Sequence, residues 1–192
     1  MKLNHFDTST NNKIVNIVQD IIPNIDITKV EYYPDNNDET GRDWKYNTSK
    51  QYLDNNKTSI ESKKENYPPV NQYLLNFGPE LIPNNLFSLV QELYPDEKIT
   101  VSGHWYYPNE GYIGWHTNCD HPNTKRLYIT YASEDKKSFF RYLKDGEIVT
   151  CYDNKGITIR EFDIPQIPEF FWHCVGSECD RYSLGFKIEK YS

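Results

Sequence analysis

The feature that most constrains the fold is a series of short aromatic and β-branched runs in the second half of the chain. After Glu97 these runs recur about every ten residues, separated by clusters of Pro, Asn, Asp and Gly. Short strands of even spacing are typical of two-sheet, all-β architectures. We therefore expect a mainly β protein with N-terminal helices and a double-stranded β-helix core, also called a jelly roll or cupin-like barrel. The predicted strands are 99–107, 111–118, 125–132, 138–143, 147–152, 157–163, 169–175 and 181–189.

Two segments of the first half have the spacing of amphipathic helices. Residues 9–22 place apolar side chains at helical intervals after a Ser/Thr/Asn cap, and Pro23 follows as a stop. Residues 83–93 repeat the pattern, and Pro95 ends it. Residues 34–69 are polar and rich in Asn, Asp, Lys and Ser, and neither the strand period nor the helix period holds for long. An irregular insertion is expected there.

The composition favours one domain with an aromatic core. A chain of 192 residues fits a single core. Only 37% of the residues are hydrophobic but 15% are aromatic, so the core must depend on Tyr, Phe and Trp. We expect residues 1–98 to support a jelly-roll core at 99–192.

Charge and cysteine usage narrow the possible partners. The net charge of −7 disfavours an extended nucleic-acid-binding face, which needs clustered cations. The four cysteines show no Cys-x-x-Cys pair, which favours reduced thiols. The N-terminus lacks the apolar stretch of a secretion signal, and no apolar run is long enough to span a bilayer. We therefore expect a cytoplasmic protein without a membrane partner.

Two histidines lie in predicted strands that are far apart in the sequence. His116 occurs in Gly-Trp-His-Thr-Asn and His173 in Phe-Trp-His-Cys. Strand histidines half a barrel apart can converge on one ion, and a non-haem Fe(II) oxygenase needs two imidazoles, usually with a carboxylate. Trp115 and Trp172 precede the histidines and must face the other way, so they are predicted to pack in the core or against a helix.

A possible anion anchor follows His173 by eight residues. Arg181-Tyr-Ser183 places a guanidinium and a hydroxyl on one face of a strand. Such a pair can hold a carboxylate in a fixed orientation. This is what 2-oxoglutarate requires, because its keto acid chelates iron while its distal carboxylate needs an anchor.

Together these motifs resemble the 2-oxoglutarate- and Fe(II)-dependent oxygenase superfamily. The resemblance rests on Tyr107-Pro-Asn-Glu-Gly-Tyr-Ile-Gly-Trp-His116, His173 and Arg181-Tyr-Ser183, and it covers 99–189, about half of the chain. Prolyl hydroxylases share the Tyr and Gly before the metal histidine. The resemblance implies Fe(II), 2-oxoglutarate and dioxygen (O2), with the chemistry located at the metal centre.

Aspartyl/asparaginyl β-hydroxylases form a second similar branch. Their pattern implies an Arg-x-His on the next strand that contacts the cosubstrate, and Arg126-Leu-Tyr128 holds this place with Tyr instead of His. The cosubstrate contacts implied by the resemblance are therefore Arg181, Ser183, Arg126, Tyr128 and Tyr107.

The chain departs from the superfamily pattern at the third metal ligand. Asn118 occupies the position where Asp or Glu is usual, and an amide offers only a neutral oxygen. Three arrangements compete: Asn118 ligates or stays near the iron, the metal relies on His116 and His173, or Asp120 swings in as the acid. We favour the two-histidine site with Asn118 beside it. A halide in place of the carboxylate, as in related halogenases, is disfavoured because Asn is larger than Ala or Gly.

The expected function is hydroxylation of a protein or peptide side chain, or of a small polar substrate, with succinate and CO2 as co-products. One alternative is a non-catalytic jelly-roll binding module with a degenerate metal site. Another is a nucleobase oxygenase, which the acidic charge disfavours but a lysine cluster in the insertion leaves open (Lys57, Lys63 and Lys64). Substrate choice is expected to depend on loops, above all on 34–69.

Overall fold

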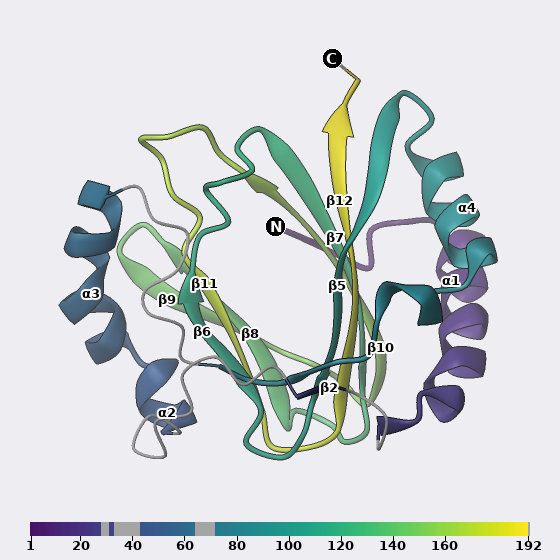
Figure 1. The fold of residues 1–192 in the computed structure, drawn as a ribbon, viewed down its shortest axis with the longest axis horizontal. Helices are drawn as coiled ribbons and strands as arrows, with labels where there is room; N and C mark the ends of the chain where they lie inside the picture. Colours follow the sequence, from purple (N-terminus) through teal and green to yellow (C-terminus); the bar gives the residue numbers. More distant parts are fainter. Residues whose placement is uncertain (28–30, 33–42, 64–71, 192) are drawn as a thin grey trace.

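The protein is built around two antiparallel sheets that face each other, as shown in Figure 1 by a computed structural model that describes residues 1–27, 31–32, 43–63 and 72–191. Eight core strands follow one another along the second half of the chain. They are β5 (Glu97–Tyr107), β6 (Tyr112–His116), β7 (Thr124–Ala132), β8 (Ser138–Lys144), β9 (Glu147–Tyr152), β10 (Gly156–Ile164), β11 (His173–Ser177) and β12 (Arg181–Lys190).

The order of the strands identifies the core as a double-stranded β-helix. The seven-stranded sheet has the order β1-β10-β7-β12-β5-β4-β2, and the five-stranded sheet has the order β3-β6-β11-β8-β9. The chain therefore crosses between the sheets as it runs from β5 to β12, which wraps the two sheets around one interior. This confirms the predicted fold class. Short edge strands complete the sheets: β1 (Lys2–Leu3), β2 (Glu31–Tyr32), β3 (Gln72–Tyr73) and β4 (Leu75–Asn76).

Two predicted strands have different bounds in the structure. The strand expected at 169–175 begins only at His173, because Glu169 donates a backbone hydrogen bond to Gln166 in a turn and Pro168 has no N–H for a ladder. The strand expected at 111–118 ends at His116, and Asn118 has a φ of 56°, which is not extended backbone.

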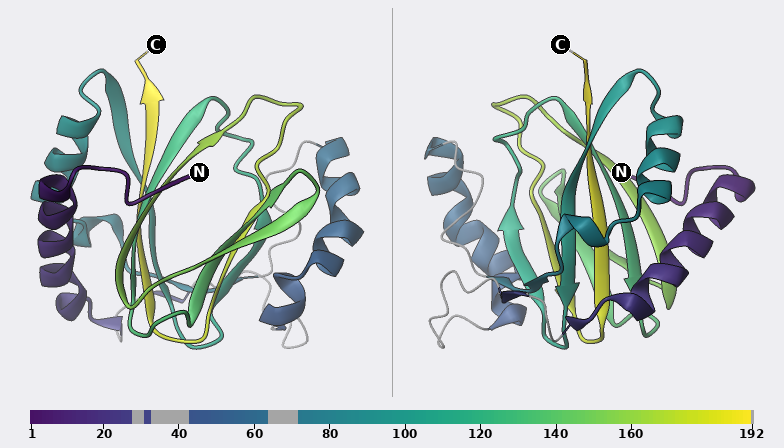
Figure 2. Two further views of the ribbon diagram at one scale, coloured as in Figure 1. Left: turned by 180° about the vertical axis from the view of Figure 1, so that it is seen from behind. Right: turned by 45° about the vertical axis from the view of Figure 1, so that its right-hand side comes forward.

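Two helices, both predicted from the sequence, cover the outer face of the larger sheet (Figure 2). They are α1 (Thr8–Ile21) and α4 (Asn84–Leu93). Asp7 caps α1 by accepting a hydrogen bond from the Thr10 N–H. Ile14, Val18, Leu86 and Val90 are fully buried between the helices and the sheet. The short 3-10 turns η1 (Ile22–Asn24) and η4 (Pro79–Leu81) follow α1 and precede α4. No helix in the described ranges is long and apolar enough to cross a membrane.

The prediction of an irregular insertion at 34–69 is wrong where the structure describes that segment. It contains α2 (Trp44–Asn47) and the longer α3 (Lys50–Lys63), while 34–42 and 64–69 lie outside the described residues. The apolar side chains of α3 are few, but Tyr52, Leu53 and Ile60 fall on one helical face and are buried against the smaller sheet. Packing against the smaller sheet therefore stabilises a helix that the polar composition of the segment did not predict.

A buried carboxylate fastens the N-terminus to the outer face of β10. Glu161 lies 2.9 Å from Lys2 Nζ, 3.2 Å from His5 Nε2 and 3.4 Å from Lys125 Nζ, and it accepts a hydrogen bond from the Tyr94 hydroxyl. Burial alone would raise the pKa of Glu161, but these hydrogen bonds and charges lower it from 4.5 to about 2.

This depressed pKa predicts a specific loss of stability in acid. The folded-state pKa of Glu161 lies below the unfolded value, so its contribution is complete above pH 4.5 and is lost as the pH falls towards about 2. Over that window we expect the free energy of unfolding to fall by on the order of 2 kcal/mol more in the wild type than in Glu161→Gln. Urea denaturation at a series of pH values measures the difference, and identical acid slopes would contradict it.

Candidate functional site

The two strand histidines meet at one end of the smaller sheet. His116 is the last residue of β6 and His173 is the first residue of β11. The two are directly paired in the antiparallel register, and their ring centroids lie 4.0 Å apart. Both side chains are buried. The structure therefore brings together the imidazoles that the sequence pattern paired.

Hydrogen bonds fix both imidazoles in the form that can bind a metal. Nδ1 of His116 lies 2.8 Å from the Gly114 carbonyl oxygen, and Nδ1 of His173 lies 2.8 Å from that of Phe171. A carbonyl can only accept, so each Nδ1 carries the proton and each Nε2 keeps its lone pair. Burial lowers the pKa of His116 to about 4, and burial together with the His116 ring lowers the pKa of His173 well below 6.5. Both rings are therefore neutral near neutral pH.

The two tryptophans next to the histidines anchor the strands from behind. Trp115 Nε1 donates to the Ser49 carbonyl at 2.9 Å, and Trp172 Nε1 donates to Glu61 at 2.9 Å. Their rings pack with the buried face of α3. This confirms that they face away from the histidines, and it shows how α3 holds the ends of β6 and β11.

Asn118 reaches the histidines from beyond the end of β6. Its side chain is buried, and its Nδ2 lies 3.1 Å from Nε2 of His173, to which it donates. The left-handed turn at Asn118 brings it there, rather than the strand alternation assumed from the sequence. Asp120 instead is exposed, with its carboxylate 3.5 Å from His121. In the part of the chain that the structure describes, no three His, Cys, Asp or Glu side chains gather as a metal site.

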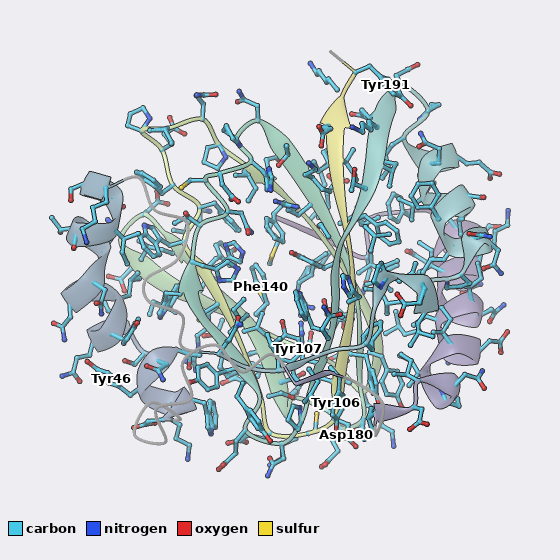
Figure 3. The ribbon with its side chains drawn as sticks, viewed as in Figure 1. Tyr46, Tyr106, Tyr107, Phe140, Asp180 and Tyr191 are labelled. Atoms are coloured by element: carbon cyan, nitrogen blue, oxygen red, sulfur yellow. The ribbon has the colours of Figure 1, made fainter. Side chains whose placement is uncertain are left out.

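A cavity between the sheets links the histidines to two buried arginines. His116 and His173 line it together with Arg160 and Arg181. The histidines and the arginines lie near opposite ends of β11. The strand starts at His173, and its last residue, Ser177, pairs with Ser138. The Ser138 hydroxyl donates to Asp153, which pairs with both arginines. Figure 3 shows two further lining residues, Tyr107 and Phe140, between the sheets.

The arginines share a single carboxylate. Arg181 Nε donates to Asp153 Oδ2 at 3.1 Å, Arg160 Nη2 pairs with Oδ1 of the same residue, and the Ser138 hydroxyl also donates to Asp153. Arg181 Nη2 donates to Thr130 Oγ1 at 3.3 Å. Arg181 Nη1 and the Nε and Nη1 atoms of Arg160 are buried without a hydrogen-bond partner among the described residues.

This cluster carries an uncompensated positive charge. Burial alone would raise the pKa of Asp153, but the charges of Arg160 and Arg181 hold it below its usual value, so it is ionised. Two guanidinium groups and one carboxylate then leave one net positive charge in a buried place. Unpaired buried charge is unfavourable, so this end of the cavity is suited to an anion.

The other predicted cosubstrate contacts divide into two groups. Tyr107, Tyr128 and Ser183 line the cavity, and the Arg181 guanidinium lies 4.8 Å from the centre of the Tyr107 ring. Arg126 is buried farther along β7, where its Nη1 donates to Ser102 Oγ at 2.9 Å.

The sequence prediction missed Arg160 and Asp153. Alternation along β10 puts Arg160 on the same face as Phe162, which packs between the sheets, so an inward-facing charge was the available signal. Asp153 follows β9 in a connection between strands, and no local pattern marks it.

The lysine cluster considered for nucleic-acid binding lies away from this cavity. Lys57 and Lys63 belong to α3, on the outside of the smaller sheet, and Lys57 lies 3.6 Å from Glu61. Lys64 lies outside the described residues. These contacts give no support to a nucleobase substrate.

Fold and site together define a double-stranded β-helix protein with a paired-histidine, paired-arginine cavity. Among solved structures, the chain is similar to a Pseudomonas putida prolyl-4-hydroxylase, with a TM-score of 0.41 and 10% identity over 93% of this chain and 100% of that chain. No known family profile and no curated protein matches the sequence. Similarity at this level carries no information on activity, so the function is inferred from the site itself.

Proposed function

We propose that the protein is an Fe(II)- and 2-oxoglutarate-dependent oxygenase that hydroxylates a protein side chain or a small molecule. One observation carries the proposal: a single buried cavity has two neutral imidazoles at one end and an uncompensated pair of guanidinium groups at the other. A keto acid that chelates a metal at one end and bears a carboxylate at the other matches both ends.

The histidine end fits a divalent iron. Each Nε2 carries the lone pair that a metal would use, and at His173 the ion would replace the hydrogen bond from Asn118 Nδ2. Imidazole is a suitable donor for Fe(II). Asn118 adds a neutral amide, and among the described residues no carboxylate joins the histidines as a third ligand, so this part of the site brings no negative charge to the ion. The keto-acid cosubstrate would supply that charge, and metal affinity is therefore expected to rise when 2-oxoglutarate is present.

The arginine end fits the distal carboxylate of 2-oxoglutarate. Arg181 Nη1 and the free Arg160 donors are already desolvated and lack partners, so a carboxylate can accept from them without displacing a protein bond. Ser183 lines the same cavity and brings a hydroxyl. Asp153 holds the two guanidinium groups in fixed orientations.

The protein's part in the reaction is to bind, orient and exclude water. Iron with 2-oxoglutarate supplies oxidising power from dioxygen, with succinate and CO2 as co-products. The Gly114 and Phe171 carbonyls hold the imidazoles in the ligating tautomer, while Arg160 and Arg181 fix the far end of the diacid. Phe140 and Tyr128 also line the cavity, and their rings would limit the access of water to the bound diacid.

Arg181→Met is expected to weaken 2-oxoglutarate binding roughly 10- to 100-fold, because charge-assisted hydrogen bonds to the carboxylate are lost. Titration calorimetry in the presence of Mn(II), which keeps dioxygen chemistry out of the measurement, gives the affinity. Arg141→Met is the matched control, because Arg141 stacks on Phe139 and bonds Thr150 outside the cavity. Equal affinities of wild type and Arg181→Met would contradict the proposed anchor.

Turnover tests the proposal as a whole. Wild-type protein with Fe(II), 2-oxoglutarate, dioxygen and candidate substrates should release succinate, because succinate is a co-product of the proposed reaction. Binding of 2-oxoglutarate without succinate release, including in the presence of candidate substrates, would favour the non-catalytic module instead.

A further inference from the structure

A third buried arginine faces the interior near the histidines. Arg126 has the same strand face as Tyr128, which lines the cavity. It is in register with Lys187 of β12 on one side and with Phe162 of β10 on the other. Only 3% of Arg126 is exposed. Phe162, its neighbour across the strand pair, has its ring centroid 5.2 Å from that of His173, so Arg126 lies close to the histidine end.

Arg126 lacks a compensating anion. Its Nη1 donates to the neutral Ser102 hydroxyl, and its Nε is buried without a partner. No ion pair joins Arg126 to a carboxylate within the described ranges. Neighbouring Lys187 differs, since its Nζ lies 2.5 Å from Glu189. A buried guanidinium without a compensating carboxylate is energetically unfavourable, so the site indicates an anionic ligand beside Arg126.

Aromatic rings lie beside this cation. The Phe162 and Phe171 ring centroids are 4.9 Å apart, and each lies 5.2 Å from that of His173. Tyr142 stacks on Phe171 at 5.8 Å. Phe162 is buried, whereas Phe171 and Tyr142 are only partly buried, so the aromatic set extends from the histidines towards the surface.

We propose that the histidine end binds a substrate that joins a carboxylate to an apolar body, with the carboxylate on Arg126 and the apolar body against Phe162 and Phe171. The assignment of this ligand as the substrate rests on the proposed oxygenase function. The 2-oxoglutarate cosubstrate does not need Arg126, because the histidine pair and the Arg160–Arg181 pair already match its two ends. The rings would hold the C–H bonds of the apolar body beside His173.

Calorimetry with a matched pair of ligands tests this assignment. The probes are 3-phenylpropionate and its neutral analogue 3-phenylpropionamide, each titrated into protein saturated with Mn(II) and 2-oxoglutarate. We expect saturable binding of the carboxylate, at least tenfold tighter than that of the amide. Arg126→Met should weaken carboxylate binding roughly 10- to 100-fold, while Lys187→Met, the matched control, changes it less than about threefold.

The outcomes separate this inference from the oxygenase proposal. Absence of saturable carboxylate binding, equal affinity for acid and amide, or competition with 2-oxoglutarate would overturn the inference. A loss of 2-oxoglutarate affinity in Arg126→Met as large as that in Arg181→Met would also overturn it, because Arg126 would then serve the cosubstrate. If 2-oxoglutarate fails to bind but the carboxylate binds through Arg126, the anion site stands and the oxygenase proposal fails. If Arg126→Met does not fold, the acid–amide comparison in the wild type decides.

Discussion

Alanine in place of His116 or His173 is expected to lower Fe(II) affinity by more than about 100-fold and to abolish succinate formation. Loss of a residue that merely orients a metal ligand typically costs 10- to 100-fold, and loss of a ligand costs more. The effect should be large here because no described third His, Cys, Asp or Glu joins the pair, so one imidazole remains beside a neutral amide. Equilibrium titration of Fe(II) under anaerobic conditions, with 2-oxoglutarate present, measures the change.

His121→Ala is the control for this prediction. His121 is close to Asn118 in the chain, but its side chain is 49% exposed and faces Asp120. Its replacement should leave both iron affinity and succinate formation within about twofold of the wild type. If His116→Ala and His173→Ala fold and keep wild-type iron affinity, the two imidazoles do not form the metal site.

Asp153→Asn is expected to destabilise the fold by about 3–5 kcal/mol, because removal of one partner from a buried ion cluster leaves its charges uncompensated. Arg160 and Arg181 would then face each other across a neutral amide, next to an interior that contains Phe140 and Tyr107. Urea denaturation of the protein without added ligand measures the free energy of unfolding. Asp54→Asn is the control, because Asp54 forms an exposed pair with Lys50 on α3 and should matter by less than about 1 kcal/mol.

The same variant tests whether the cluster binds an anion. A ligand that binds only the folded state stabilises it by mass action. Saturating 2-oxoglutarate should therefore recover part of the stability lost in Asp153→Asn, since its carboxylate brings negative charge to the two arginines. If Asp153→Asn destabilises the fold by less than about 1 kcal/mol, the buried charges of Arg160 and Arg181 do not depend on Asp153 for compensation.

The sequence predicted the core because each strand repeats a simple local rule. Aromatic and β-branched residues alternate, and Pro, Asn, Asp and Gly end each run, so seven of the eight strands were placed within two residues at their first residue. Helix α3 was missed because its stability comes from Trp115 and Trp172 on the distant smaller sheet, and these contacts are invisible in the local pattern.

The site could be predicted only where its residues follow one another in a recognisable order. Strand position and spacing singled out His116, His173 and Arg181, and the structure places all three along one cavity; their roles stay predictions. Arg160 and Asp153 were not singled out, because the ion cluster joins β10, β12 and the connection after β9, and only the fold brings these segments together. Asn118 was placed beside the histidines for the wrong reason, since a left-handed turn and not strand alternation turns it towards His173.

Anaerobic absorption spectroscopy of the wild-type protein with Fe(II) and 2-oxoglutarate tests the central claim most directly. A visible charge-transfer band should develop only when both are present, and it should be lost in His173→Ala and need a higher 2-oxoglutarate concentration in Arg181→Met. If saturating Fe(II) and 2-oxoglutarate give no such band with folded wild-type protein, the histidines and arginines do not hold an iron-bound keto acid between them.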